Sequence, residues 1–308
     1  MCDRLVSEGV RVVGLDNFDP YYARAVKERN LAWARGQGNF VFVEGDVRDG
    51  ELLEKMMRKA RVGTVVHLAA KAGVRASVED PAGFESVNVG GTMTVLEAMR
   101  RTGAKRLAFG SSSSVYGNNK KVPFAEQDRV DEPISPYAAT KKAGELLCHT
   151  YHHLYKMDIV CLRFFTVYGP RQRPDLAIHK FVRLLEAGEA VEMYGDGSMA
   201  RDFTYIDDIV DGVMAALREC RGWNLFNLGE SRPYRVEDLI RMLERVMKVK
   251  AVVERKPVPP GDVKQTYADI LRATTKLGYR PKVRLEDGLA RFVAWYRAQE
   301  EVRTEKQE

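Results

Sequence analysis

The sequence lacks several features that define whole classes of protein. Its 308 residues contain no apolar run near the roughly 18 residues of a membrane span, and no basic-then-apolar signal peptide opens the chain. The four cysteines lie far apart and form no CxxC pair, which argues against a zinc site or a disulfide framework. We therefore predict a cytoplasmic protein with no bound metal and no membrane partner.

Charge of one sign is also scarce. The chain has 49 Lys and Arg against 43 Asp and Glu, a net charge of +6, and its basic residues are scattered among acids. No basic stripe is interleaved with aromatic residues in the manner of nucleic-acid-binding proteins. With 45% hydrophobic and 30% charged residues, the composition is that of an ordinary globular protein. We expect a small anionic substrate to be a better partner than nucleic acid.

The first half of the chain alternates strand and helix patterns. Apolar, β-branched runs predict strands at 10–15, 39–47, 64–70, 106–111 and 158–166, and helical patterns lie at 51–59, 81–101 and 137–155. Buried apolar strands that alternate with helices are typical of a parallel sheet covered on both faces. The sequence therefore predicts an α/β fold with a Rossmann-like, doubly wound parallel sheet.

After residue 166 the pattern becomes irregular. Prolines and glycines punctuate shorter elements, which predicts a smaller C-terminal lobe built largely from loops over 167–308, after a main domain over 1–166. The run 223–228 is apolar and predicts a last strand that returns to the main sheet. Because open parallel sheets bind ligands at the carboxyl ends of their strands, the polar residues just after the strands are the candidate site.

Two features meet at that edge. Tyr137 and Lys141 are four residues apart in a helical pattern and so share one helix face. An ammonium beside a phenol lowers the phenol's pKa, which suits a tyrosine for general-base work. The serines at 111–114 follow the strand at 106–111, which places hydroxyls at the same edge of the sheet. Each feature alone is a weak signal, since serines are also common in turns, but together they predict one catalytic pocket.

Several segments now resemble a known family in the same order and spacing. AFGSSSSVYGNN, SPYAATKKAGE, LRFFTVYGPRQRPD, GDGSMARDFTYIDDI and PPGDVKQTYAD are similar to segments of the extended short-chain dehydrogenase/reductases, the NAD-dependent epimerase/dehydratase family. LDNFDPYYARAVKERNL and HLAAKAGVRASVEDP most resemble the UDP-glucuronate 4-epimerase subgroup. The resemblance covers residues 1 to about 296.

The resemblance implies a set of catalytic and cofactor-binding residues. Tyr137 is the general base, Lys141 its partner and ribose anchor, and Ser112 the hydroxyl that binds the reacting sugar oxygen. Asp16 holds the adenosine ribose, which favours NAD over NADP because a carboxylate repels a 2′-phosphate. The implied NAD-binding set within the NAD-binding domain at 1–166 is Asp16, Asn17, Asp46, Val47, Ala69, Ala70, Lys71, Asn88, Tyr137 and Lys141.

The resemblance also implies substrate contacts. Arg201 and Asp262 match the family's diphosphate and uridine-ribose contacts, and Arg173 is a substitute for an arginine that relatives often carry at the position of Pro259. The implied substrate-binding set is Arg75, Ser113, Ser114, Thr166, Arg173, Arg201 and Asp262. A second departure concerns the start of the sequence. The family opens with a strand and a GxxGxxG loop that holds the pyrophosphate, and we expect both to be absent here, which would weaken NAD binding.

The implied reaction is epimerisation of a UDP-sugar by transient oxidation at C4. The family's 4,6-dehydratases use an acid pair where this chain has Ser113 and Ser114, and its decarboxylases use a glutamate at the position of Ser114. UDP-glucose epimerases usually have asparagine at the position of Thr166. Neutral hydroxyls suit a C6 carboxylate, so UDP-glucuronate is the expected substrate and UDP-glucose the alternative. A UDP-sugar-binding relative without turnover also stays open. Relatives form homodimers through the helices at 81–101 and 137–155, and we expect the same here.

Overall fold

The computed structural model describes residues 1–219, 221–258 and 265–305. Contacts within the chain divide it into two compact units. Unit 1 comprises 1–118, 128–163 and 213–226, and unit 2 comprises 119–127, 164–212 and 227–308. The domain boundary at residue 166 stays a prediction.

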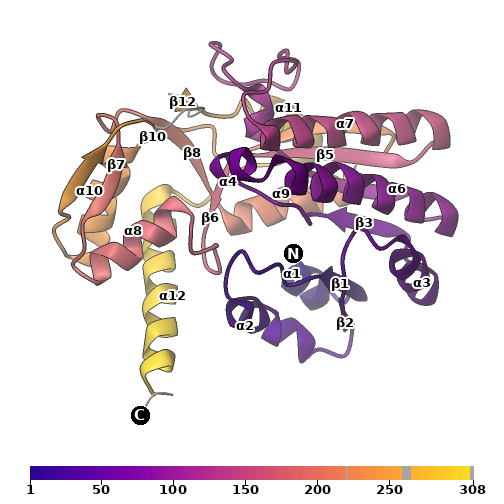
Figure 1. The fold of residues 1–308 in the computed structure, drawn as a ribbon, viewed down its shortest axis with the longest axis horizontal. Coiled ribbons are helices and arrows are strands. Elements are labelled where there is room, and N and C mark those ends of the chain that lie inside the picture. Colours follow the sequence, from indigo (N-terminus) through magenta and orange to yellow (C-terminus); the bar gives the residue numbers. More distant parts are fainter. Residues whose placement is uncertain (220, 259–264, 306–308) are drawn as a thin grey trace. The chain divides into compact units, whose positions relative to one another are not determined.

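Unit 1 alternates helices and strands, as the sequence predicts (Figure 1). In chain order its elements are α1 (Cys2–Ser7), β1 (Val12–Asp16), α2 (Arg24–Arg35), β2 (Phe40–Glu44), α3 (Gly50–Ala60), β3 (Thr64–His67), α4 (Val74–Glu79), α5 (Pro81–Glu85), the π-helix η1 (Ser86–Gly90), α6 (Gly91–Thr102), β4 (Arg106–Ser112), the 3-10 helix η2 (Ser113–Tyr116) and α7 (Pro136–Tyr155). β5 (Asp158–Phe164) and β9 (Trp223–Leu228) belong to unit 1 except for their last residues.

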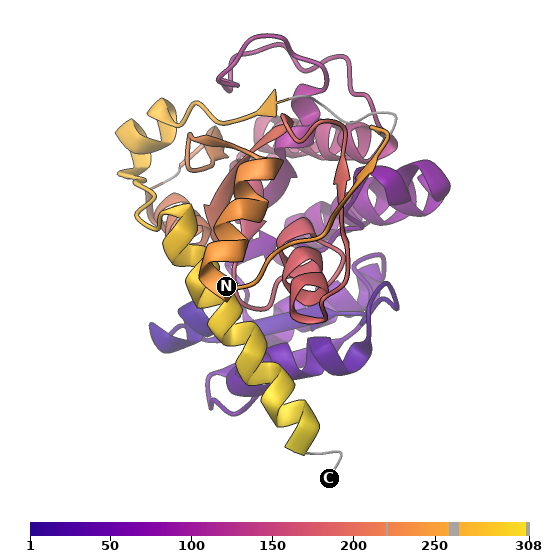
Figure 2. The same ribbon diagram turned by 90° about the vertical axis from the view of Figure 1, so that its left-hand side faces the viewer.

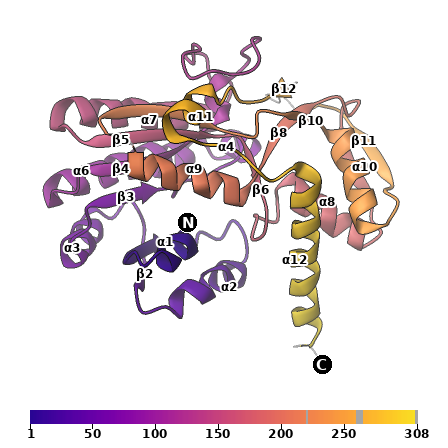
Figure 3. The ribbon, with the colours of Figure 1, turned by 180° about the vertical axis from the view of Figure 1, so that it is seen from behind.

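The strands of unit 1 form two sheets. β3, β4, β5 and β9 are neighbours in that order, and β3 and β4 run parallel with His67 opposite Phe109. Figure 3 shows β3, β4 and β5 in this sheet. β1 and β2 form a separate parallel pair, in which Asp16 lies opposite Glu44. The α/β class with parallel sheets is confirmed, and the run 223–228 is a strand beside β5, as predicted.

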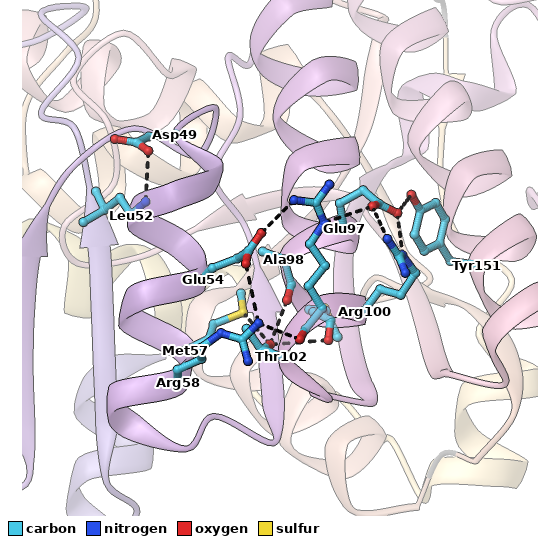
Figure 4. Close-up of polar contacts among 12 residues, drawn as sticks. Asp49, Leu52, Glu54, Met57, Arg58, Glu97, Ala98, Arg100, Thr102 and Tyr151 are labelled. Carbon is cyan, nitrogen blue, oxygen red and sulfur yellow. Dashed lines mark hydrogen bonds and ion pairs between the residues drawn. The ribbon is translucent and has the colours of Figure 1, made fainter.

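Helices α3, α6 and α7 supply much of the unit 1 core. Their buried residues include Leu53, Met57, Leu96, Met99 and Cys148, which pack with residues of β4 and β5. Polar contacts also link these helices (Figure 4). Arg101 of α6 pairs with Glu54 of α3 at 3.1 Å. Glu97 of α6 accepts a hydrogen bond from Tyr151 of α7 at 2.5 Å. The helix that carries the candidate base is thus fixed to its neighbour.

Unit 2 is richer in regular structure than the sequence suggests. Its elements are β6 (Thr166–Tyr168), α8 (Ala177–Glu186), β7 (Val191–Tyr194), β8 (Ala200–Tyr205), β10 (Pro233–Arg235), α10 (Val236–Met247), β11 (Val253–Lys256), β12 (Gln265–Thr266), α11 (Leu271–Leu277) and α12 (Leu285–Glu305), with the first half of α9 (Ile206–Glu219). The prediction of a lobe built largely from loops is therefore wrong. Pro170 and Pro174 lie between β6 and α8, and Gly195 and Gly197 lie between β7 and β8, so these residues mark connections between regular elements.

Two small sheets and a helical core organise unit 2. β10, β8 and β12 are neighbours in that order, β6 also pairs with β8, and β11 pairs with β7. Figure 2 shows α12, in yellow, beside α10, and the two helices are in contact. Leu239 and Leu243 of α10 and Phe292 of α12 are fully buried in the same apolar cluster. Of the helices in the described ranges, none is at once long and apolar enough to cross a membrane.

Candidate active site

The start of α7 presents the Tyr137 and Lys141 pair. Ser135 caps the helix, because its hydroxyl accepts a hydrogen bond from the Ala138 amide at 3.1 Å, and Pro136 occupies the first turn, where proline is favourable. One turn separates Tyr137 from Lys141, so both side chains leave the helix on the same side.

Lys141 is buried against β4. Its side chain donates a hydrogen bond from Nζ to the Gly110 carbonyl at 2.7 Å, and only 6% of the residue is exposed. Its ammonium also lies 5.4 Å from the centre of the Phe109 ring. Burial lowers the pKa of Lys141 to about 8 because the charged form is removed from water. The side chain of Lys141 is therefore held beside β4, in surroundings that disfavour its positive charge.

The serine run begins at the end of β4. Ser112 is the last residue of that strand and is buried, while Ser113 and Ser114 begin η2 and are half-buried. The Ser112 hydroxyl accepts a hydrogen bond from the Ser114 amide at 3.2 Å, which fixes the turn. α7 packs against both β4 and η2. The structure therefore brings the serine run and the helix of Tyr137 and Lys141 together within unit 1.

The loop after β3 is fastened to the same helix. Lys71, which follows Ala69 and Ala70, exchanges two hydrogen bonds with Asn88: its amide donates to Asn88 Oδ1 at 2.8 Å, and its carbonyl accepts from Asn88 Nδ2 at 2.9 Å. Asn88 Nδ2 also donates to the Thr140 hydroxyl at 3.0 Å. Asn88 therefore links this loop to α7, while direct contact with a cofactor stays a prediction.

Acidic and amide side chains follow β1 and β2. Asn17 donates to Asp46 Oδ2 at 3.0 Å, which joins the ends of the two strands. Hydrogen bonds from Arg48 hold the pKa of the Asp46 carboxyl well below its usual range. Val47 differs from these polar neighbours, since it is buried against Gly91 and belongs to the unit 1 core.

The donor set of unit 1 fits a dinucleotide. The Asp16 carboxylate, at the end of β1, accepts a hydrogen bond from the Phe18 amide at 2.7 Å and keeps 51% of its side chain exposed. An exposed carboxylate at a strand end suits the two hydroxyls of a ribose. Lys141 is a buried hydrogen-bond donor of the kind that would hold a second ribose. NAD is therefore compatible with the residues present.

The remaining candidates are spread over both units. Arg75 is exposed on α4 of unit 1, and α4 packs against α7. In unit 2, Thr166 begins β6 opposite Phe203 of β8, and Arg173 pairs with Asp175 at 2.8 Å. Arg201 Nη1 donates to the neighbouring carbonyl of Ala200 at 2.9 Å. Asp262 and Pro259 lie outside the described residues.

Sequence reasoning missed an ion pair behind the serine run. Glu145 of α7 pairs with Arg163 of β5 at 2.8 Å, and the Ser111 hydroxyl donates to the same carboxylate at 2.7 Å. Glu145 is four residues after Lys141 and Arg163 is the one charge in an apolar strand after its first residue, so both signals stand in the sequence. What the sequence does not show is that they meet.

The chain was compared with known proteins. Residues 1–292 match the family described as GDP-mannose 4,6-dehydratase. The chain belongs to the GDP-mannose 4,6-dehydratase family. This membership confirms the resemblance drawn from the sequence motifs, and it accounts for the parallel sheets of unit 1.

Two curated relatives in the GDP-mannose 4,6-dehydratase family carry a more specific name. The chain is 42% identical over 292 residues to UDP-glucuronate 4-epimerase of Thermodesulfobacterium geofontis, covering 94% of this chain and 90% of the relative. It is 44% identical over 310 residues to UDP-glucuronate 4-epimerase 4 of Arabidopsis thaliana, covering 95% and 71%.

A solved structure agrees with these relatives. The UDP-glucuronic acid 4-epimerase of Bacillus cereus, crystallised with UDP-glucuronic acid and NAD, matches this fold with a TM-score of 0.91 and 36% identity. The match covers 97% of this chain and 95% of that one. Within the GDP-mannose 4,6-dehydratase family, this chain is therefore similar to epimerases in both sequence and fold.

Proposed function

We propose that this protein is an NAD-dependent 4-epimerase that interconverts UDP-glucuronate and UDP-galacturonate. The observation that carries the proposal is the packing of α7, with Tyr137 and Lys141, against the strand and turn that hold Ser112. The two relatives named UDP-glucuronate 4-epimerase, which are 44% and 42% identical to this chain, support the choice of reaction.

Tyr137 is the proton-transfer group in this proposal. As a phenolate it takes the proton of the C4 hydroxyl, and it returns a proton to the oxygen when the sugar is reduced again. Lys141 favours the phenolate, because a positive charge beside a phenol lowers the phenol's pKa. Ser112 orients the C4 oxygen toward Tyr137. A bound NAD would supply the acceptor and later the donor of the C4 hydride, and the oxidised sugar must turn over in the pocket before the hydride reaches its opposite face.

A second part of the proposal concerns the residues that contact the substrate. Ser113 and Ser114 are half-buried hydroxyls next to Ser112, and they suit a carboxylate at C6 because they add no negative charge. The family resemblance, and no contact in the structure, assigns the same role to Thr166 and contacts with the diphosphate to Arg173 and Arg201. The role of Asp262 likewise rests on its motif alone.

A single substitution tests the reaction. Tyr137→Phe keeps the ring that lies edge-on to Phe84, with centroids 6.2 Å apart, and removes only the hydroxyl. We expect turnover of UDP-glucuronate to fall about 10²- to 10⁴-fold, the usual contribution of a general base. Tyr155→Phe, on the same helix with 41% of the residue exposed, is the matched control and should keep wild-type turnover. Full activity of Tyr137→Phe would remove this residue from the mechanism.

We also propose a homodimer and a cytoplasmic location for this enzyme. Apolar side chains of α7 and α6 are exposed on unit 1: Leu146 at 57%, Leu154 at 58% and Met93 at 38%. Leu146 and Leu154 are eight residues apart, so they lie along one stripe of α7. A second copy that presents the same stripe would cover both, as in an isologous two-fold interface.

A further inference from the structure

The ion pair between Glu145 and Arg163 is unusual in its burial. Arg163 is 1% exposed and Glu145 is 2% exposed. Arg163 donates two hydrogen bonds, from Nε to Oε1 and from Nη2 to Oε2, both at 2.8 Å. Burial alone would raise the pKa of the Glu145 carboxyl, but these contacts outweigh it and hold that pKa below its usual range. The carboxylate therefore stays charged inside the core.

The pair contacts residues on both sides of Ser112–Ser114. On the side of Glu145, the Ser111 hydroxyl donates to Oε1 at 2.7 Å, directly before Ser112. On the other side, the Arg163 guanidinium lies 4.8 Å from the centre of the Tyr116 ring, which closes η2. Ser112, Ser113 and Ser114 thus lie between two points that are held by the same ion pair.

Glu145 also makes one of the contacts by which α7 lies along β4. Three consecutive residues of the strand contact three positions on one side of the helix. Phe109 packs so close to Gly144 that a Cβ there would overlap its ring, the Gly110 carbonyl accepts from Lys141, and Ser111 donates to Glu145. Glu145 is one turn beyond Lys141 and two turns beyond Tyr137 on the same face.

We propose that Glu145 and Arg163 are positioning residues for the epimerase reaction, which hold the serine run in register with Tyr137 and Lys141. The inference rests on the proposed function. A bidentate Arg–carboxylate pair has a fixed geometry, so it sets distances more tightly than an apolar contact would. A buried ion pair is often no more stabilising than well-packed apolar residues of the same volume, so stability is a weak explanation for a charged pair at this place.

The test uses a substitution that keeps the charge and changes the length. Glu145→Asp shortens the side chain by one methylene and should draw Ser111 or Arg163 out of place. We expect kcat to fall about ten- to a hundredfold, since a displacement of about 1 Å near an active site has effects of that size. The KM for UDP-glucuronate should change less than twofold, because the diphosphate contacts assigned to unit 2 are untouched. Amide hydrogen exchange in 109–116 should become faster.

A matched control separates position from stability. Asp208 is a buried carboxylate in unit 2, 3% exposed, that accepts from the amides of Lys282 and Val283 at 2.9 and 3.0 Å. Asp208→Asn should lower the melting temperature as Glu145→Asp does, with kcat and exchange in 109–116 unchanged. If Glu145→Asp does not fold, Ser111→Ala removes only the hydroxyl from the carboxylate and should still lower kcat severalfold with KM retained.

The outcomes distinguish a failure of the positioning role from a failure of the proposed function. Unchanged exchange in 109–116, or an equal loss of kcat in Glu145→Asp and Asp208→Asn, would overturn the positioning role. A wild-type enzyme that fails to interconvert the two sugars would instead contradict the proposed function. In that case the exchange comparison still decides whether the ion pair holds the serine run.

Discussion

Lys141, to which we assign a role in the reaction, is buried at a cost to the fold. Its pKa falls from the usual 10.5 to about 8 through burial, so between those pH values the unfolded chain binds more protons than the folded one. Wild-type stability should therefore rise with pH across that window, and below pH 8 the full penalty applies. A difference of about 2.5 in pKa corresponds to about 3 kcal/mol.

Lys141→Met removes the positive charge proposed to favour the Tyr137 phenolate, so it should abolish turnover. It also removes a buried charge, so it should not weaken the fold. At pH 7 we expect the variant to be about 2 kcal/mol more stable, which is the burial penalty less about 1 kcal/mol for the lost bond to Gly110. Chemical denaturation at pH 7 and pH 10 measures both values, and the advantage should shrink at the higher pH. A variant that is much less stable at pH 7, or an advantage independent of pH, would show that the lysine is not penalised by burial.

Thr166 is the residue assigned to substrate choice. Thr166→Asn should shift preference from UDP-glucuronate toward UDP-glucose about ten- to a hundredfold, because a hydrogen bond to a charged group is worth about 1.5–3 kcal/mol. Competition between the two substrates gives the ratio directly. Thr275→Asn, at an exposed position of α11, is the control and should leave the ratio as in wild type. The same ratio in both variants would refute the assignment.

For single residues of the candidate site, the sequence is informative where the signal is local. Tyr137 and Lys141 are one helical turn apart, and the serine run follows its strand directly, so both could be read without knowing the fold. Glu145 and Arg163 are 18 residues apart on different elements, and no spacing rule pairs them. Asn88 was predicted to touch the cofactor, while its contacts to Lys71 and Thr140 depend on three separate segments.

The central contact between elements is the docking of α7 onto β4. Gly144 makes it possible, because any Cβ at this position would overlap the Phe109 ring. Gly144→Ala should therefore cost about 1–3 kcal/mol through overpacking, although alanine is the better helix former by about 1 kcal/mol. Urea denaturation measures the loss, and kcat should fall with it.

Gly90→Ala provides the comparison for that substitution. It also places an alanine in a helical segment, but its Cβ would meet no atom within 4 Å. We expect its stability to equal or exceed that of wild type. Equal stability of the two alanine variants would mean that α7 and β4 are not in the close contact that the account requires.

Most element positions in unit 1 follow from hydrophobic pattern, because long strand–helix alternation repeats a strong signal. The helix predicted at 81–101 is instead α5, a π-helical turn and α6, and the π-helical turn carries Asn88. The side chain of Asn88 in this turn bonds to Lys71 and Thr140, contacts that local propensity does not indicate. In unit 2 the frequent prolines and glycines in the sequence do not predict the short strands that the structure contains. Three of these strands, β6, β10 and β12, pair with β8 and so join segments that are far apart in the sequence.

For the whole molecule we predict an isologous dimer through α7. Leu146→Glu places a charge in the exposed stripe and should give monomers in light scattering at micromolar concentration. Val252→Glu, at a position of unit 2 that is 64% exposed, should leave the dimer intact. A wild-type monomer, or a Leu146→Glu variant that still dimerises, would contradict the assignment of this face.

The reaction itself concerns the whole molecule, and the hydrogen at C4 tests it most directly. UDP-glucuronate deuterated at C4 is incubated with the enzyme in ordinary water, and the products are followed by NMR. We expect that UDP-galacturonate forms and keeps the deuterium at C4, because the same hydrogen leaves and returns while Tyr137 moves only the hydroxyl proton. Absence of UDP-galacturonate, or a product with solvent hydrogen at C4, would contradict it.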